Sequence, residues 1–315
     1  MPKVLFLDTV HPNFKSLLEK ADFIVDEDYD SSKEAILSKI SNYTGVVIRS
    51  RFKLDKSFLE TAQNLKFIAR VGAGMENIDV SFAESIGIKC LHAPEGNRTA
   101  VAEQAIAMLL GLMNNLFRAN NEVRSGLWKR EENRGYELEG KTLGIIGFGN
   151  MGSVFARRLA GFDCEILVYD KYKTNFGQGN IKECSLQNIF ENADIVSLHL
   201  PLTPETKHFA NAAFFQSFIK PIWFLNTARG QCLKTEDLVS AMESGLVRGA
   251  CLDVLEYEST SFESIGEGLT GGDLKTWNYL ISSDKVVLSP HIAGWTFESN
   301  QKMAEVLVEK ILKLN

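Results

Sequence analysis

Several features that mark special classes of protein are scarce in this sequence. Its 315 residues include five cysteines and five histidines, and the cysteines lie far apart, without a C-x-x-C pair. An odd number of scattered cysteines argues against a disulfide framework and a zinc site, and it favours reduced thiols in the cytosol. No run reaches the roughly 18 apolar residues of a membrane span. We therefore expect no metal, no membrane partner and a cytoplasmic location.

Positive charge is also in short supply. Lysine and arginine together number 34 against 40 acidic residues, which gives a net charge of -6. Without a basic face to attract phosphates, nucleic acid is not an expected partner. The composition, 45% hydrophobic and 23% charged, is that of an ordinary globular protein, and the length predicts two domains. The first residues, Met1–Asp8, predict a β-strand and not a signal peptide.

Short apolar segments alternate with amphipathic segments in the first hundred residues. Such alternation predicts a parallel sheet with helices on both faces, and hence a small α/β domain. The predicted strands cover residues 4–7, 23–25, 45–48, 67–71 and 88–91. The predicted helices cover residues 13–20, 32–40, 55–62 and 80–86.

The segment Thr99–Val123 is rich in Ala, Leu and Met on almost every side. A helix of this kind is buried between domains or at a subunit contact, although a simple core helix has the same composition. We expect one helix that links two domains and takes part in a homodimer.

The alternation restarts at residue 142 and continues to the end of the chain. Six strands, the number expected of a complete doubly wound nucleotide domain, are predicted. Glycine-rich residues 259–272 predict a surface loop, and residues 296–314 predict an amphipathic helix. The predicted fold class is therefore α/β, with Rossmann-like or flavodoxin-like parallel sheets. The six strands cover residues 142–146, 165–169, 195–198, 222–226, 249–254 and 286–289.

The sequence Gly-Phe-Gly-Asn-Met-Gly at residues 147–152 closes the first of these strands and opens a helix. A G-x-G-x-x-G segment in this position is typical of dinucleotide binding. Gly147 allows the tight turn, Gly149 lets the backbone approach a pyrophosphate, and Gly152 lets the helix pack close to the strand. An ordinary turn between strand and helix is the less favoured interpretation.

Asp170 ends the next predicted strand, where a carboxylate can hold the ribose hydroxyls of a dinucleotide. The same carboxylate would repel the additional phosphate of NADP. NAD is therefore the expected cofactor, although Lys171 and Lys173 leave NADP open.

Side chains suited to hydride transfer follow three more of the predicted strands. In open α/β sheets, ligands bind beyond the carboxyl ends of the strands. Arg229 can grip a carboxylate and polarise the neighbouring carbonyl, and His291 can exchange a proton near neutral pH. Glu258 beside His291 would favour the protonated imidazole. Each could be structural on its own, but their joint position at strand ends favours catalysis.

Five segments in this order resemble the D-isomer-specific 2-hydroxyacid dehydrogenase family, and the likeness covers nearly the whole chain. The resemblance implies an NAD-binding Rossmann domain of residues 98–294 and a discontinuous substrate domain of residues 1–97 and 295–315. It implies that Arg229 binds the substrate carboxylate, that His291 is the acid/base, and that Glu258 is its partner. The segments are residues 147–152 with Asp170, 197–206, 226–230, 253–258 and 289–294. The cofactor-binding residues implied are Gly147, Gly149, Asn150, Met151, Gly152, Asp170, Pro201, Thr206, Ala228, Asp253 and Gly294.

Within the family, the likeness is strongest to the D-3-phosphoglycerate dehydrogenases of serine biosynthesis. It implies that Arg49 and Arg51 bind the substrate phosphate, from one face of an extended segment, and that the amides of Ala73 and Gly74 hold the substrate carboxylate. The alternative is that the two arginines are exposed charges, and the substrate is then glyoxylate, hydroxypyruvate or another short 2-oxo acid. A further alternative is an NAD(H)-sensing protein similar to the transcriptional corepressors of this fold.

Three features depart from the family pattern. Ser259 replaces the usual proline, and Trp295 replaces a small residue and is expected to narrow the pocket. A long predicted loop, residues 259–284, leaves open the distance between Glu258 and His291. The chain also ends at Asn315, without the regulatory domain of the long phosphoglycerate enzymes, so serine feedback is not expected.

Overall fold

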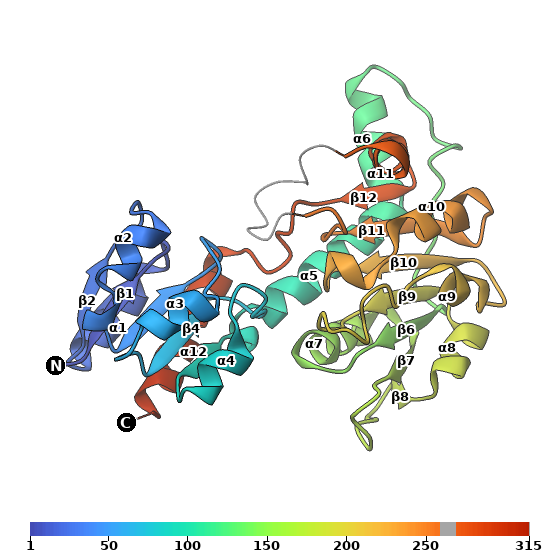
Figure 1. Cartoon of the computed structure of the whole chain (residues 1–315). Helices are drawn as coiled ribbons and strands as arrows, with labels where there is room; N and C mark the ends of the chain where they lie inside the picture. The colour runs from blue at the N-terminus through green and yellow to red at the C-terminus, as the bar shows by residue number, and fades with distance from the viewer. Residues whose placement is uncertain (259–268, 315) are drawn as a thin grey trace. The chain divides into compact units, whose positions relative to one another are not determined.

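The structure, a computed structural model, describes residues 1–258 and 269–314 (Figure 1). It divides into two compact units, one of residues 1–98 and 295–314 and one of residues 99–258 and 269–294. Each unit contains one all-parallel sheet with a hydrophobic core on either face. The predicted α/β fold class with two doubly wound parallel sheets is therefore confirmed.

The sheet of the first unit has the order β2-β1-β3-β4-β5, one of the two common doubly wound orders. All five predicted strands and all four predicted helices are present, with small differences at their ends. The strands are β1 (Lys3–Phe6), β2 (Ile24–Glu27), β3 (Gly45–Ile48), β4 (Phe67–Arg70) and β5 (Lys89–His92). The helices are α1 (Pro12–Lys20), α2 (Lys33–Leu37), α3 (Lys56–Thr61), α4 (Val80–Ser85) and a 3-10 turn, η1 (Ile40–Asn42).

Alternation along the strands builds the two cores of this unit. In β1, Val4 and Phe6 belong to one cluster, while Leu5 belongs to the cluster on the other face. The C-terminal helix α12 (Phe297–Leu312) packs into the first cluster through side chains that include Leu307. The end of the chain thus completes the unit formed by its beginning.

The sheet of the second unit has the order β12-β11-β10-β9-β6-β7-β8, which contains the dinucleotide-binding order 3-2-1-4-5-6. The six predicted strands are confirmed. A seventh, β8 (Ile181–Glu183), was not predicted, because it has three residues and buries only Ile181. The other strands are β6 (Thr142–Ile146), β7 (Glu165–Tyr169), β9 (Ile195–Leu198), β10 (Ile222–Asn226), β11 (Val247–Leu252) and β12 (Val286–Leu288).

Helices cover both faces of this sheet. Between the strands of the nucleotide-type fold lie α7 (Asn150–Arg158), η2 (Leu159–Phe162), α8 (Leu186–Asn192), α9 (Ala212–Gln216), η3 (Gly230–Cys232), α10 (Thr235–Glu243) and α11 (Gly271–Ser282). The predicted loop at residues 259–272 lies mostly outside the described residues. The prediction of a loop as far as residue 284 is wrong, because α11 buries Thr276 and Leu280.

The prediction of one helix over residues 99–123 is also wrong. Two helices, α5 (Pro94–Met113) and α6 (Leu116–Arg124), meet at a bend of 62°. Asn115 at the bend has a φ of 51°, which an α-helix cannot accommodate. Of the described helices, no single one has the length and apolar character to cross a membrane, whereas this bent pair meets that criterion only when taken together.

Candidate active site

The glycine turn lies between β6 and α7, where the order of the sheet reverses, because β6 has β7 on one side and β9 on the other. Ligands of doubly wound sheets bind at such a point. A Cβ atom on Gly147 would lie 2.5 Å from the carbonyl oxygen of His199, and one on Gly152 would lie 2.0 Å from the carbonyl oxygen of Gly147. Beyond the residues adjacent to it in the chain, no described heavy atom lies within 4 Å of a Cβ position on Gly149. The turn therefore fits a pyrophosphate, with tight packing behind the backbone and open space beside the middle glycine.

Asn150 and Met151 begin α7, so their amides belong to the first turn of the helix, where intrahelical acceptors are lacking. Asp170 at the end of β7 supports this turn. One of its oxygens accepts the N–H of Phe148 at 2.7 Å, and the other accepts the N–H groups of Tyr172 and Lys173, each at 2.9 Å. A carboxylate has about four acceptor positions, so one remains for a ribose hydroxyl.

Burial raises the pKa of Asp170, but the three backbone N–H groups outweigh it and hold the pKa below the usual value. The two neighbouring lysines both contact oxygens of the protein. Lys173 Nζ donates to the carbonyl of Phe148 at 2.8 Å, and Lys171 forms an ion pair with Glu205. These contacts weaken the case that the lysines receive the additional phosphate of NADP.

The loop after β9 contains Pro201 and Thr206, two of the predicted cofactor residues. The Thr206 hydroxyl donates to the carbonyl of Pro201 and accepts the N–H of Thr203 at 2.8 Å, which closes the loop on itself. At the start of the loop, His199 is buried against the glycine turn, and its Nε2 lies 3.0 Å from the hydroxyl of Ser197. Burial lowers the pKa of His199 to about 4.

His291 and Glu258 are brought together, although 33 positions separate them in the sequence. His291 Nδ1 lies 2.8 Å from Glu258 Oε2, and the other oxygen of Glu258 accepts the N–H of Leu255. The backbone N–H of Leu255 thus fixes one oxygen of the Glu258 carboxylate, and the other oxygen faces the imidazole. This pair is the arrangement in which a carboxylate orients a histidine for proton exchange.

Asp253 shapes the loop that presents His291. Its carboxylate is 1% exposed and accepts the Ser289 hydroxyl at 2.6 Å and the N–H groups of Ile292 and Ala293, each at 2.9 Å. Its carbonyl accepts the N–H of His291 at 2.8 Å. These four contacts hold His291 at a φ of 55°, in the left-handed region. This supporting role was not predicted, because the partners follow 36 to 40 positions later.

The Arg229 turn is held by a buried side chain that sequence reasoning also missed. Asn226 Oδ1 accepts the N–H of Ala228 at 3.1 Å, and its Nδ2 donates to the carbonyl of Arg229 at 3.0 Å. The Arg229 guanidinium donates to the carbonyl of Ala228 at 2.6 Å. The signal was present, since an asparagine two positions before Ala228 is typical of an Asx-turn. Gly294 is the last residue of this unit.

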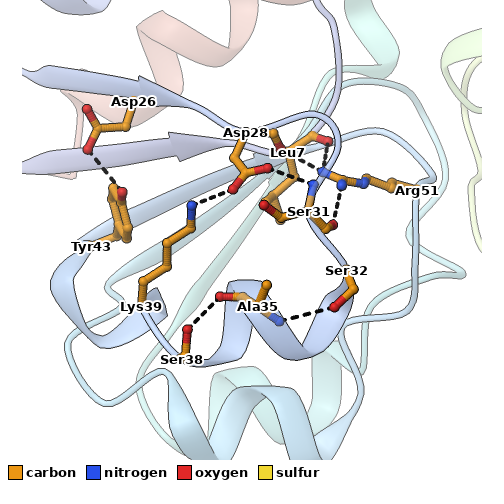
Figure 2. Close-up of polar contacts among 10 residues, drawn as sticks. All are labelled: Leu7, Asp26, Asp28, Ser31, Ser32, Ala35, Ser38, Lys39, Tyr43 and Arg51. Atoms are coloured by element: carbon orange, nitrogen blue, oxygen red, sulfur yellow. Dashed lines mark hydrogen bonds and ion pairs between the residues drawn. The ribbon is translucent and has the colours of Figure 1, made fainter.

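Arg49 and Arg51 in the first unit have different surroundings. The carboxylate of Asp8 accepts the N–H groups of residues 49, 50 and 51 at 2.6, 3.2 and 3.4 Å. The Arg51 guanidinium donates to three backbone carbonyls, as Figure 2 shows, and so holds β1 and the segment after β2 together. Arg49 instead lies over the indole of Trp295, 4.4 Å from its centroid. The two guanidinium groups therefore have different partners. The carbonyls belong to Leu7, Asp28 and Ser31.

Ala73 and Gly74 lie in the turn after β4, which β5 holds in place. His92 Nδ1 lies 2.6 Å from the carbonyl of Ala73. The N–H of Ala93 donates to the carbonyl of Gly72 at 2.8 Å. These contacts fix the carbonyls of Gly72 and Ala73, and so they define the backbone conformation of the turn.

Comparisons with known proteins agree with this geometry. Residues 106–293 match the family described as D-isomer specific 2-hydroxyacid dehydrogenase, NAD binding domain. A glyoxylate reductase of Thermofilum pendens is 34% identical over 99% of this chain and 91% of its own. A D-3-phosphoglycerate dehydrogenase of Archaeoglobus fulgidus is 31% identical over 99% of this chain, which spans 57% of that enzyme.

Among solved structures, a D-lactate dehydrogenase of Aquifex aeolicus, complexed with NAD and lactic acid, superimposes with a TM-score of 0.85. It is 26% identical and covers 99% of this chain and 95% of its own. The sequence match, the sheet order, the glycine turn and the paired histidine and glutamate all lead to one assignment. The chain belongs to the D-isomer-specific 2-hydroxyacid dehydrogenases, and residues 106–293 are its NAD-binding domain.

Proposed function

We propose that this enzyme interconverts a short D-2-hydroxy acid and its 2-oxo acid, with D-3-phosphoglycerate and 3-phosphohydroxypyruvate of serine biosynthesis as the first candidate pair. The observation that carries the proposal is the 2.8 Å contact between His291 Nδ1 and Glu258 Oε2, just beyond the carboxyl ends of strands β11 and β12. A carboxylate-oriented imidazole in this position suits proton exchange with a hydroxyl.

In the proposed reaction, each residue has one task. Glu258 orients the ring of His291, whose Nε2 takes the hydroxyl proton on oxidation and returns it on reduction. Arg229 binds the substrate carboxylate and polarises the 2-oxo group, and the amides of Ala73 and Gly74 also bind the carboxylate. The nicotinamide, when bound, accepts or supplies the hydride.

Arg49 is the proposed ligand of the substrate phosphate. Stacking on Trp295 holds the guanidinium plane while its edge can still donate two hydrogen bonds to an anion. Arg51 is not proposed for this role, since its guanidinium binds backbone carbonyls. The likeness to the D-3-phosphoglycerate dehydrogenase of Archaeoglobus fulgidus supports this substrate.

A second candidate is the reduction of glyoxylate or hydroxypyruvate, which carry no phosphate. The observation in its favour is that Arg51 and the three amides at residues 49–51 already have partners within the protein. Of the two arginines, Arg49 alone then remains to bind a substrate phosphate. The likeness to the glyoxylate reductase of Thermofilum pendens also favours this candidate.

We further propose a substrate-binding domain of residues 1–97 and 295–315, with NAD bound by residues 98–294. We also propose a homodimer. The structure describes all nine residues of α6, none of them is buried, and the exposed apolar side chains among them could pack against a second copy of the chain. The five free cysteines support a cytosolic location.

The test is NADH oxidation with phosphohydroxypyruvate, hydroxypyruvate, glyoxylate and 2-oxoglutarate, on wild type and three single variants. Arg49→Ala should raise the KM for phosphohydroxypyruvate by about 10- to 100-fold, the value of a charged hydrogen bond, and leave the KM for glyoxylate unchanged. Arg51→Ala should chiefly lower stability. Lys53→Ala, which removes a nearby exposed charge, is the control and should change neither KM.

Three outcomes decide between the candidates. Loss of a phosphohydroxypyruvate preference in Arg49→Ala supports the first candidate. Preference for glyoxylate or hydroxypyruvate, unaltered by Arg49→Ala, replaces it with the second. Tight NADH binding without turnover of any of the four acids would reject both substrates.

A further inference from the structure

Glu256 contacts two neighbouring loops of the second unit at once. It follows β11 by four positions, and its side chain is 13% exposed. One carboxylate oxygen accepts the N–H of Thr235 at 2.8 Å. The other lies 2.7 Å from Nε2 of His208 and 3.9 Å from Nζ of Lys234. Neither oxygen faces His291, so Glu256 has no part in the proton exchange proposed above.

Each partner of Glu256 lies next to a loop with a proposed role. His208 follows the loop that contains Pro201 and Thr206. Thr235 begins α10, immediately after the segment that follows Arg229. Glu256 itself belongs to the turn that ends at Glu258. The carboxylate therefore connects the loops proposed to hold cofactor, substrate and the acid/base pair.

Direct packing reinforces these connections. A Cβ atom on Gly230 would lie 1.9 Å from the carbonyl oxygen of Leu255, so the Arg229 turn rests directly on the Glu256 turn. The N–H of His208 donates to the carbonyl of Gln231 at 2.8 Å. His208 has a φ of 52°, a left-handed conformation that is uncommon for histidine and needs support from its surroundings.

Capping of α10 alone does not account for Glu256. A carboxylate at a helix N-terminus is favourable, and in the described part of the chain the N-cap residue, Lys234, makes no side-chain cap bond. Capping, however, requires one oxygen. The second oxygen lies 2.7 Å from Nε2 of His208, which belongs to a different loop, as well as 3.9 Å from Nζ of the N-cap residue Lys234.

We propose that Glu256 is a positioning residue for hydride transfer, and that its contact with His208 couples the cofactor loop to the turn that holds Glu258. The proposal rests on the function proposed above. A cofactor that orders residues 201–206 also fixes His208. His208 then fixes the carboxylate of Glu256 and the turn from Leu255 to Glu258. Glu258 thereby keeps its contact with His291 when the dinucleotide is in place.

The kinetic test compares two substitutions at one position. His208→Ala and His208→Gln carry the same left-handed backbone, but only glutamine can still donate to Glu256. We expect His208→Ala to lower kcat about tenfold, as loss of a charged hydrogen bond does, with the KM for NADH within about threefold. His208→Gln should restore kcat to within about threefold of wild type. Equal kcat values for the two variants would overturn the coupling.

Glu165→Ala is the matched control. Its carboxylate also makes two side-chain contacts, to Lys182 at 2.7 Å and Thr142 at 3.3 Å, but at the opposite edge of the sheet, where β6 and β7 begin. It should lower kcat by less than about twofold, because loss of an exposed ion pair acts on stability alone.

Hydrogen exchange measured by mass spectrometry tests the coupling without turnover. In wild type, saturating NADH should slow exchange in residues 199–208 and in residues 253–258. In His208→Ala it should slow exchange only in residues 199–208. A purely structural contact would leave both effects of NADH unchanged in the variant, and this result would overturn the proposal. Failure of the proposed reaction would not affect this measurement, so the two failures are distinguishable.

If His208→Ala did not fold, Glu256→Ala would replace it. Its methyl side chain cannot accept a hydrogen bond from His208, whereas an amide at this position could donate to a neutral imidazole and keep the contact. The same loss of NADH protection at residues 253–258 is expected. If NADH slowed exchange at those residues as much in this variant as in wild type, the coupling would be contradicted.

Discussion

At the scale of single residues, three carboxylates within six positions serve three purposes. Asp253 holds the loop that carries His291, Glu258 faces the imidazole, and Glu256 connects two neighbouring loops. Of these three carboxylates, that of Glu258 is the one that contacts the His291 ring. The chemistry of this segment therefore depends on where each carboxylate points, and not on how many acidic residues it contains.

His291→Asn tests the acid/base role with the least disturbance to the backbone. Asparagine tolerates the left-handed φ of 55° at this position but cannot exchange a proton. We expect kcat to fall by about 10²- to 10⁴-fold, the usual contribution of general acid–base catalysis. The dissociation constant of NADH, measured by fluorescence titration, should change less than about threefold, because the residue acts on the substrate proton. Turnover within a few-fold of wild type would show that another group exchanges the proton.

His199 gives the second unit a stability that depends on pH. Burial lowers its pKa from 6.5 to about 4, so the unfolded chain binds the proton more readily than the folded protein. The contribution of neutral His199 to the free energy of unfolding is complete above 6.5, the pKa of the unfolded chain, and is lost as the pH falls toward about 4. Between pH 7 and pH 5 this loss amounts to about 2 kcal/mol.

The measurement is urea unfolding of wild type and His199→Gln at the two pH values. Glutamine can keep the contact with Ser197 but does not titrate. Between pH 7 and pH 5, the free energy of unfolding should therefore fall by about 2 kcal/mol less in the variant than in wild type. An equal fall in both proteins would mean that His199 is not the group responsible.

Residues whose partners are near in sequence were predictable, and residues with distant partners were not. The glycine turn and Asp170 were recognised because their spacing is fixed by one strand-turn-helix-strand unit. Arg51 was expected to bind a phosphate, and it binds carbonyls that lie 44, 23 and 20 positions away. The pattern Arg49-Ser-Arg51 contains no information about those carbonyls, because tertiary packing alone brings them together.

At the scale of elements, hydrophobic period and length decided what could be predicted. The strands of both sheets are apolar runs between turn signals, so eleven of them were found from the sequence. β8 was missed because three residues are too few to show a period. The bend between α5 and α6 was missed because Asn115 is compatible with a helix by composition and interrupts it only through its φ.

Asn115 offers a direct measure of the cost of that bend. Both Asn115→Gly and Asn115→Ala remove the side-chain contact to the carbonyl of Arg134 at 3.2 Å, so their difference isolates the backbone conformation. The alanine variant should be about 1 kcal/mol less stable than the glycine variant in urea unfolding, because only glycine adopts a φ of 51° without steric cost. Equal stability would mean that the bend relaxes in the alanine variant.

At the scale of the whole molecule, the exposed apolar side chains after α5 need an explanation. Leu116 is 60% exposed and Trp128 is 78% exposed, and both lie in one continuous segment. Large apolar side chains that cluster on a surface mark contacts with another protein more often than they mark free surface. The sequence predicted a homodimer through residues 99–123. We place the proposed contact at α6 and the residues that follow it, since residues 102–113 of α5 contribute to the core of the second unit.

Leu116→Glu combined with Trp128→Glu tests this proposal. A symmetric contact centred on α6 would bury two unpaired carboxylates from each protomer, so the protein should change from a dimer to a monomer of 35.1 kDa in sedimentation velocity. Ile219→Glu, at a side chain 74% exposed in the same unit, is the control and should remain dimeric. A wild-type protein that sediments as a monomer at all concentrations would reject the homodimer. A double variant that stays dimeric would place the contact elsewhere on the chain, since no symmetric interface centred on α6 could bury four unpaired carboxylates.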